Sequence, residues 1–300
     1  MTGQGDLACD MVVAELGRLG ANVVRLDLAA GFHHLDCVLR DGVWHGTITT
    51  PQGRTVALQA VGSVLWRWPG QPAGHPALDD QAERAWGATQ DTEAVFGVLK
   101  SLPVRWMNHP DRTAAASSKA VQLRDAARVG LPVPRTLIAT HGSAVESWMT
   151  PGGQHIYKAF KAPFRPGGVI VPATRVTPQE VPGELLAASM FQPLVHSVPI
   201  RATVVGDGIF AVRVEGDFAV DWRPTQTEAV LTPVVVPVEA HRGIHSLMRL
   251  WGLTYGAFDF IADGDGRWWF LENNCAGQFG FVELKTGLGI AGAIAAWLTR

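Results

Sequence analysis

The chain has 300 residues, of which 47% are hydrophobic and 17% charged, and its formal net charge is -2. This composition is typical of a globular protein with two or three lobes. Phosphate binding along a nucleic acid needs clustered Lys and Arg, so a nearly neutral chain argues against a nucleic-acid partner. The first ten residues lack the pattern of a signal peptide, and the apolar stretch Leu288–Leu298 is too short to span a bilayer. The three cysteines have no disulfide-like or metal-like spacing, so we expect a cytoplasmic protein without a membrane partner.

The first third of the chain predicts a small α/β lobe, because helical and strand patterns alternate between turn residues. Its expected elements are a helix at Met11–Leu19, a strand at Asn22–Leu28, a hairpin from Val43–Thr49 and Thr55–Val61, a strand at Ser63–Trp68 and a helix at Asp79–Lys100.

The rest of the chain predicts a mixed lobe followed by a strand hairpin with flanking helices. The expected helices are Asp111–Val129, Val238–Trp251 and most of Gly280–Leu298. The expected strands are Ile156–Phe160, Met190–Leu194, Ala202–Gly206, Ile209–Val214, Tyr255–Ala262 and Arg267–Asn273. This order favours an α+β fold of about three subdomains.

The last hairpin carries the clearest chemical signal. Glu272 and Asn274 are two apart on one strand and therefore project to one face. A turn at Asp263–Gly266 places Asp259 opposite roughly residue 270, which makes Glu272 its diagonal neighbour. Two carboxylates and an amide oxygen form the all-oxygen ligand set that Mg²⁺ prefers. On spacing alone, an edge hairpin with a solvated polar face is the alternative.

Basic residues upstream of this hairpin are candidate phosphate ligands. Lys119 lies on an expected helix, and Lys158 lies in an apolar strand, where a lone Lys needs an anionic partner or a path to the surface. Arg201 and Arg213, on the two arms of one hairpin, suit phosphate or carboxylate, with surface salt bridges as the alternative. The segment Phe191–Val195 offers backbone groups and apolar walls to an adenine ring, or is a core strand that ends at a proline.

These groups, in this order, resemble the ATP-grasp fold. That family has a lysine before the mixed lobe, a strand lysine, a hinge strand for adenine, a phosphate-binding arginine, and Asp, Glu and Asn as magnesium ligands, the last two as Glu-x-Asn. The resemblance implies nucleotide contacts at Lys119, Lys158, Gln192, Leu194, Val195 and Arg201, and Mg²⁺ ligands at Asp259, Glu272 and Asn274.

The resemblance also implies three lobes, with ATP between the central and C-terminal ones. Their expected bounds are 1–110 for an N-terminal pre-ATP-grasp lobe, 111–195 for the central lobe and 196–300 for the C-terminal lobe with the magnesium site. Pro199 and Ile200 precede Arg201 where the family usually has an acid for the ribose hydroxyls, so the ribose-binding residue stays open.

Several further segments narrow the resemblance. They are Trp66–Pro69, Trp106–Pro110, Lys119 with Gln122–Leu123, Gly130–Thr136, Asp221–Arg223, Phe270–Asn274 and Gly277–Gly280. Over nearly its whole length the chain looks like the graspetide synthetases, which are macrocyclases of microviridin-type ribosomal peptides. The discriminating elements are Asn108-His109-Pro110 and Asp221-Trp222-Arg223, because generic ATP-grasp ligases do not generally carry both.

The implied reaction uses ATP, Mg²⁺ and a precursor peptide with a leader and an acidic core. An Asp or Glu side chain of the peptide is activated as an acyl phosphate, and a Ser or Thr hydroxyl or a Lys amine then attacks it. We expect Arg223, with Arg213, to hold the incoming carboxylate, and Asp221 to accept the nucleophile's proton or to order Arg223. A local salt bridge is the alternative for Asp221 and Arg223. The resemblance also implies a homodimer.

Two other functions remain open at this point. The first is an ATP-grasp ligase that acts on free amino acids or on a protein tail without a leader peptide. The second is an ATP-binding module that has lost turnover. The complete set of magnesium ligands argues against the second, since a binding module without turnover does not need all three.

Overall fold

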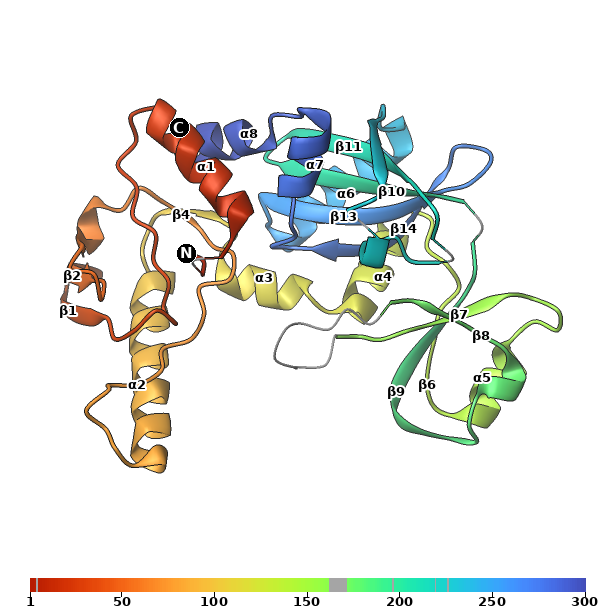
Figure 1. Ribbon diagram of the computed structural model, residues 1–300, viewed down its shortest axis with the longest axis horizontal. Coiled ribbons are helices and arrows are strands. Elements are labelled where there is room, and N and C mark those ends of the chain that lie inside the picture. Colours follow the sequence, from red (N-terminus) through yellow and green to blue (C-terminus); the bar gives the residue numbers. More distant parts are fainter. Residues whose placement is uncertain (4, 162–171, 196, 219, 226) are drawn as a thin grey trace.

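The structure is a computed structural model that describes residues 1–300 except 4, 162–171, 196, 219 and 226. A five-stranded sheet occupies the middle of the molecule, between an N-terminal α/β lobe and a four-stranded sheet with one helix (Figure 1). The predicted α+β class is confirmed by this arrangement. No helix in the described part of the chain has the length and apolar content needed to cross a bilayer.

The N-terminal lobe combines a three-stranded antiparallel sheet with two helices. Its elements are α1 (Leu7–Arg18), β1 (His34–Arg40), β2 (Val43–Thr49), β3 (Thr55–Ala57), the short η1 (Leu58–Ala60), β4 (Ser63–Leu65) and α2 (Gln81–Lys100). The expected strand at Asn22–Leu28 is wrong, because this segment makes isolated backbone bonds instead of a ladder. The amide of Thr2 donates to Leu26, and the amide of Leu28 donates to Pro69.

The central part begins with two helices where one was expected. These are α3 (Pro110–Ala116) and α4 (Lys119–Arg128), which follow β5 (Arg105–Met107). Ser117 ends α3, and Ser118 adopts the extended backbone of a helix N-cap before Lys119. Lys119 is therefore the first residue of its helix rather than a residue in the middle of one.

The four-stranded sheet has the order β6-β9-β7-β8. Its elements are β6 (Leu137–His141), α5 (Gly142–Trp148), β7 (His155–Lys158), β8 (Thr174–Val176), the short η2 (Pro178–Glu180) and β9 (Glu184–Pro193). One face packs on α5 through Phe191 and Val145. Residues of the other face, including Met190, join the core of the five-stranded sheet.

The five-stranded sheet has the order β12-β11-β10-β13-β14. Its strands are β10 (Val198–Val205), β11 (Gly208–Glu215), β12 (Val230–Pro233), β13 (Tyr255–Ala262) and β14 (Trp268–Asn274). The other elements of this region are η3 (Arg223–Thr225), α6 (Val238–Trp251), α7 (Gly280–Thr286) and α8 (Ile290–Leu298). Gly252 ends α6 in the left-handed conformation, where a glycine avoids the clash of a Cβ atom.

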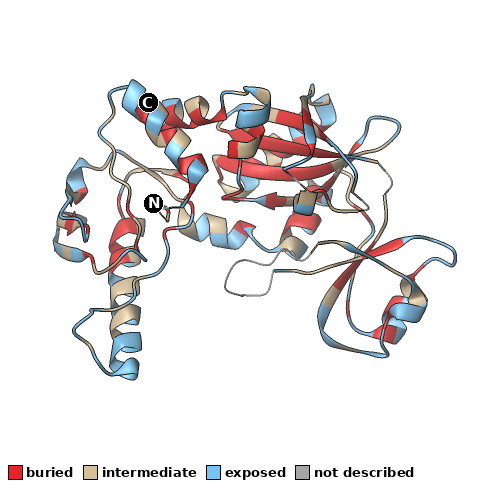
Figure 2. Ribbon diagram, in the orientation of Figure 1, coloured by how far each residue is buried: buried red, intermediate tan, exposed pale blue. Residues whose placement is uncertain are grey.

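Two apolar layers cover this sheet, and its strands are among the most buried parts of the chain (Figure 2). On one face Phe258, Phe260 and Phe270 pack against residues of α4 and α6. On the other face α1, α7 and α8 form a second core with residues such as Phe279 and Ile294. The bounds 1–110, 111–195 and 196–300 of the three lobes stay a prediction.

Candidate active site

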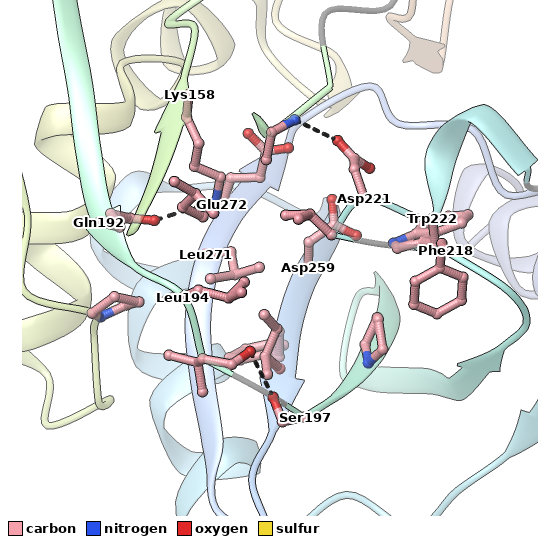
Figure 3. Close-up of a pocket in the computed structure, with 18 of the residues that line it drawn as sticks. Lys158, Gln192, Leu194, Ser197, Phe218, Asp221, Trp222, Asp259, Leu271 and Glu272 are labelled. Atoms are coloured by element: carbon pink, nitrogen blue, oxygen red, sulfur yellow. Dashed lines mark hydrogen bonds between the residues drawn. The ribbon is translucent and has the colours of Figure 1, made fainter. Parts of the chain in front are cut away.

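One cavity of about 210 Å³ lies where the four-stranded and five-stranded sheets meet. Most of the residues predicted to bind nucleotide, metal or substrate line it (Figure 3). They are Lys158, Gln192, Leu194, Val195, Asp221, Arg223, Asp259 and Glu272. The structure therefore brings together residues that are spread over more than a third of the chain.

The register of β13 and β14 differs from the expected one. Asp259 pairs directly with Glu272 instead of with residue 270, because a bulge follows the pair Phe260 and Phe270. Leu271 is the extra residue in this bulge, which shifts the alternation of side chains by one position. Regular alternation would place Phe270 and Glu272 on the same face. With the bulge, Phe270 enters the helix-covered core while Leu271 and Glu272 line the cavity.

Glu272 forms ion pairs with two cations from distant segments of the chain. Lys119, at the start of α4, places Nζ 3.0 Å from Oε2, and Arg223 places Nη1 2.9 Å from Oε1. Burial favours the neutral acid, but the charges of Lys119, Arg223 and Lys158 outweigh it and lower the pKa of Glu272. Glu272 is therefore ionised at neutral pH. Lys119 also donates to the carbonyl of Ala159, just after β7.

Asp259 is held by a guanidinium on the neighbouring strand. Arg201 on β10 pairs with Asp259 across the ladder, and Nη1 lies 2.9 Å from Oδ1. Burial raises the pKa of Asp259, and Glu272 adds to this effect while Arg201 opposes it. Arg201 also donates from Nη2 to the carbonyl of Gln278, and its buried Nε has no partner among the described residues. Arg201 lies behind Asp259 and does not itself line the cavity.

Asp221 and Arg223 form a tight pair beside Glu272. The carboxylate of Asp221 accepts from the backbone amide, Nε and Nη2 of Arg223, and also from the amide of Ala173. Burial raises the pKa of Asp221, but the bonds from Arg223 outweigh it and hold the pKa below its usual value. Asp221 is thus a fixed carboxylate that orients Arg223, and Arg223 reaches from it to Glu272.

On the opposite wall, Lys158 and Gln192 project from β7 and β9 (Figure 3). Lys158 donates to Oε1 of Gln192 at 3.4 Å, and Gln192 donates to Oγ1 of Thr136 at 2.9 Å. Burial lowers the pKa of Lys158, and Glu272 counteracts this effect. Leu194 follows with its amide bonded to the carbonyl of Gln154. A half-buried lysine at the end of an apolar wall is suited to bind the phosphates of a nucleotide.

Four predicted residues lie outside the lining of the cavity. Two of them, Lys119 and Arg201, pair with the lining residues Glu272 and Asp259. The other two are Arg213 and Asn274. Arg213 pairs with Ile200, whereas Arg201 pairs with Val212, so Arg213 lies on the opposite face of the sheet from Arg201. There it forms an exposed pair with Glu215. Asn274 is exposed at the end of β14, and its Oδ1 accepts from the amide of Ala276. The substrate-binding role of Arg213 and the metal-binding role of Asn274 stay predictions.

The donor set at this site fits a magnesium ion. Asp259 and Glu272 are directly opposed on adjacent strands, face one cavity and supply hard oxygen ligands. Asn274 lies two residues after Glu272, and its amide oxygen stays the predicted third ligand. Among the described residues, no group of three or more His, Cys, Asp or Glu side chains is arranged to hold a metal ion.

Several solved structures share this architecture over the full chain. The macrocyclase MdnC of Microcystis aeruginosa, bound with its precursor peptide MdnA, is 24% identical, with 100% of this chain and 98% of that chain covered and a TM-score of 0.84. A RiPP-associated ATP-grasp ligase of Chryseobacterium gregarium, in complex with ADP and a leader and core peptide, is 22% identical, covers 99% and 95%, and has a TM-score of 0.86. The chain has the ATP-grasp fold.

A further solved structure shares the fold of this chain at lower similarity. D-cycloserine synthetase DcsG is 15% identical, with 99% of this chain and 98% of that chain covered and a TM-score of 0.57. No protein-family model and no curated protein matches the chain.

The sequence assigned no role to some residues that shape the ATP-grasp site. Phe218 and Trp222 form an apolar wall next to Asp221 (Figure 3). Trp222 also contacts Phe281 on α7, with ring centroids 5.7 Å apart. The only sequence signal for this wall was the position of Trp222 between Asp221 and Arg223.

Proposed function

We propose that the chain is an ATP-dependent macrocyclase of a ribosomally made precursor peptide. The observation that carries this proposal is the placement of Arg223 beside Glu272 in the cavity that also holds Lys158. An arginine oriented by Asp221 can bind a carboxylate in the two-pronged manner that a lysine cannot. A carboxylate bound there would lie next to the phosphate end of a nucleotide.

Binding of ATP requires an exchange of partners among the charged groups. Lys119 and Arg223 now neutralise Glu272. When Mg²⁺ binds with ATP, it supplies charge neutralisation of the phosphates, and Asp259, Glu272 and Asn274 would hold it. Lys119 and Lys158 then bind phosphate oxygens. Nη1 of Arg223 and the second N–H of its Nη2 become free for the peptide carboxylate, while Asp221 keeps the guanidinium in place through Nε and Nη2.

The chemistry follows from this arrangement. One oxygen of an Asp or Glu carboxylate of the peptide attacks the γ-phosphorus of ATP, the bond from phosphorus to the bridging oxygen breaks, and ADP leaves. A Ser or Thr hydroxyl or a Lys amine then attacks the acyl carbon and releases inorganic phosphate. The peptide loses one water in total. The lowered pKa of Asp221 makes it a weak base, so its main task in this proposal is to orient Arg223.

Two solved structures support the peptide as substrate. MdnC is bound with a precursor peptide, and the Chryseobacterium ligase is bound with ADP and a leader and core peptide. D-cycloserine synthetase has the lower TM-score, which favours the peptide over a free amino acid as the substrate. A cytoplasmic location and a homodimer complete the proposal.

Mass spectrometry of a precursor peptide with enzyme, ATP and magnesium tests this function. We expect the loss of one water per ring, and fragment mapping that joins Asp or Glu side chains to Ser, Thr or Lys. Heavy oxygen placed in the peptide carboxylates should appear in the released phosphate, because the carboxylate oxygen that attacked the phosphorus leaves with the phosphate. Release of AMP, or ligation of free amino acids without loss of water from any candidate peptide, contradicts the proposal.

The variant Arg223→Lys tests the carboxylate-binding step. A single ammonium cannot reproduce the paired contact, so cyclisation should fall about tenfold to a hundredfold while ATP still binds. Calorimetry with ATP is the control. Cyclisation at the wild-type rate would show that Arg223 does not hold the peptide carboxylate.

A further inference from the structure

Two buried carboxamides, Gln122 and Asn108, hold the end of strand β14. They are 2% and 1% exposed. β14 is the edge strand of the five-stranded sheet, so its outer backbone groups face away from β13. Such groups at the edge of a sheet need other partners when they are buried. Each carboxamide supplies partners from an element outside the sheet.

Gln122 makes the hydrogen bonds with the backbone of Asn273 that a neighbouring strand would otherwise make. Its Oε1 accepts from the amide of Asn273 at 2.9 Å, and its Nε2 donates to the carbonyl of the same residue at 2.8 Å. A third bond runs from Nε2 to the carbonyl of Ala116 at 2.7 Å. The side chain therefore forms the same two bonds as a peptide group of an added strand.

Helix α4, which carries Gln122, also contacts Glu272, the residue before Asn273. Lys119 and Gln122 are three residues apart on α4, so both project from one face of the helix. Lys119 binds the carboxylate of Glu272, and Gln122 binds the backbone of Asn273. The position of α4 along β14 is thereby fixed at two consecutive residues of the strand.

Asn108 binds the backbone of Cys275, which follows Asn274. Its Nδ2 donates to the carbonyl of Cys275 at 3.0 Å and to the carbonyl of Tyr255 at 2.8 Å. Its Oδ1 accepts from the backbone amides of Thr254 and Tyr255. These bonds join the start of β13 to the end of β14 beyond the last pair of the ladder, Ala257 with Asn274. Asn274 thus lies between two residues that are each fixed by a buried side chain.

We propose that Gln122 and Asn108 are positioning residues that hold Glu272 and Asn274 in the geometry needed for magnesium with nucleotide. This inference rests on the proposed ATP-dependent function. Groups that orient metal ligands through hydrogen bonds commonly affect metal affinity by about tenfold to a hundredfold. A merely structural role would lower stability without a change in the coupling between magnesium and nucleotide.

The test measures how much Mg²⁺ strengthens the binding of ADP, by calorimetry with and without the metal. In Gln122→Met this enhancement should fall by about tenfold or more, while the affinity for ADP alone stays within about twofold. Asp125→Asn is a matched control, because Asp125 is a buried polar residue of the same helix that binds Trp251 on α6 instead of β14. It should keep the full enhancement.

Isosteric variants keep the proposal testable if Gln122→Met does not fold. Gln122→Glu and Asn108→Asp keep an acceptor oxygen and replace the donor by a charged oxygen that faces backbone carbonyls, so they should also lower the enhancement. A folded variant, verified by circular dichroism, that keeps the wild-type enhancement overturns the proposal. Failure of the wild-type protein to bind ADP would instead overturn the ATP-dependent function itself, and the positioning role with it.

Discussion

The two faces of the five-stranded sheet use the same strands for different purposes. On the face toward α6, aromatic side chains such as Phe258, Phe260 and Phe270 are almost completely buried. On the other face, next to the cavity, four cations and the fixed carboxylate of Asp221 surround the carboxyl groups of Asp259 and Glu272. The first face is apolar, whereas the second packs on α1, α7 and α8 over part of its area and concentrates charged groups beside the cavity. Changes on the two faces should therefore alter different properties.

The bulge at Leu271 makes this separation possible within one strand. Phe270 contributes to the apolar face, and Glu272 contributes to the charged face. Without the extra residue, either the aromatic ring would enter the charged cavity or the carboxylate would enter the apolar core. Burial of an unpaired carboxylate there would be costly.

The largest effect is expected on the apolar face, for Phe270→Ala. Phe270 is fully buried and packs edge-on against Phe258 and Phe260. Its truncation should lower the free energy of unfolding by about 3 to 5 kcal/mol, because it removes buried surface and leaves a cavity. Urea unfolding measures this loss. The rate per folded molecule should stay within about twofold, and a large loss of rate in the folded fraction would break the separation of the two faces.

On the charged face, Glu272→Gln should abolish most turnover with little effect on stability. Loss of the carboxylate removes a proposed metal ligand that would act on the charge of the transition state, so kcat should fall by about a hundredfold to a thousandfold. Arg223 keeps Asp221 as a partner, so the fold should persist. Rates at saturating magnesium, together with thermal unfolding, check both statements. Full activity would show that Glu272 is not a magnesium ligand.

Lys158→Met should weaken the binding of ATP without unfolding the protein. The change keeps the length of the side chain and removes its charge, at an expected cost of about 1.5 to 3 kcal/mol in binding. Because burial lowers the pKa of Lys158 in the free protein, ATP affinity of the wild type should begin to weaken as pH rises past that lowered pKa. Calorimetry over a range of alkaline pH should show this dependence in the wild type and lose it in the variant.

Arg213→Ala should have the smallest effect. Its pair with Glu215 has both side chains nearly half exposed, and such pairs contribute about 1 kcal/mol or less to stability. Since Arg213 lies on the face away from Asp259, cyclisation should change less than about twofold. A strong loss of cyclisation would instead support the role of Arg213 in holding the peptide carboxylate.

One helix and one strand of the five-stranded sheet region were predicted with their exact bounds. The helix Val238–Trp251 was predicted with the correct ends, since Gly252 after it marks a helix stop. The strand Tyr255–Ala262 was also correct, because its apolar residues and the following Asp-Gly turn agree. Both are local signals.

The remaining differences depend on contacts that local patterns do not contain. No glycine or proline marks the bulge at Leu271, which follows from packing on both faces of β14. The extended backbone of Ser118 likewise interrupts a helical pattern that otherwise runs through Lys119. The sequence did allow a prediction of the face on which Arg213 lies. A two-residue turn that pairs Val205 with Gly208 also pairs Arg201 with Val212, and Arg213, one residue further, then lies on the opposite face of the sheet.

The bonds that fix β14 have a consequence for the order of folding. Gln122 and Asn273 are separated by 151 residues, and Asn108 and Tyr255 by 147. Contacts over such distances along the chain form late, because the entropy of closing the loop must be lost before they stabilise anything. During synthesis, therefore, the core of the N-terminal lobe that α2 shares with Leu28 and Ile48 can become compact before the final hairpin is made, whereas α1 must wait for α8. The nucleotide site should arise only once the final hairpin has left the ribosome, so chains released early would contain folded structure and no activity.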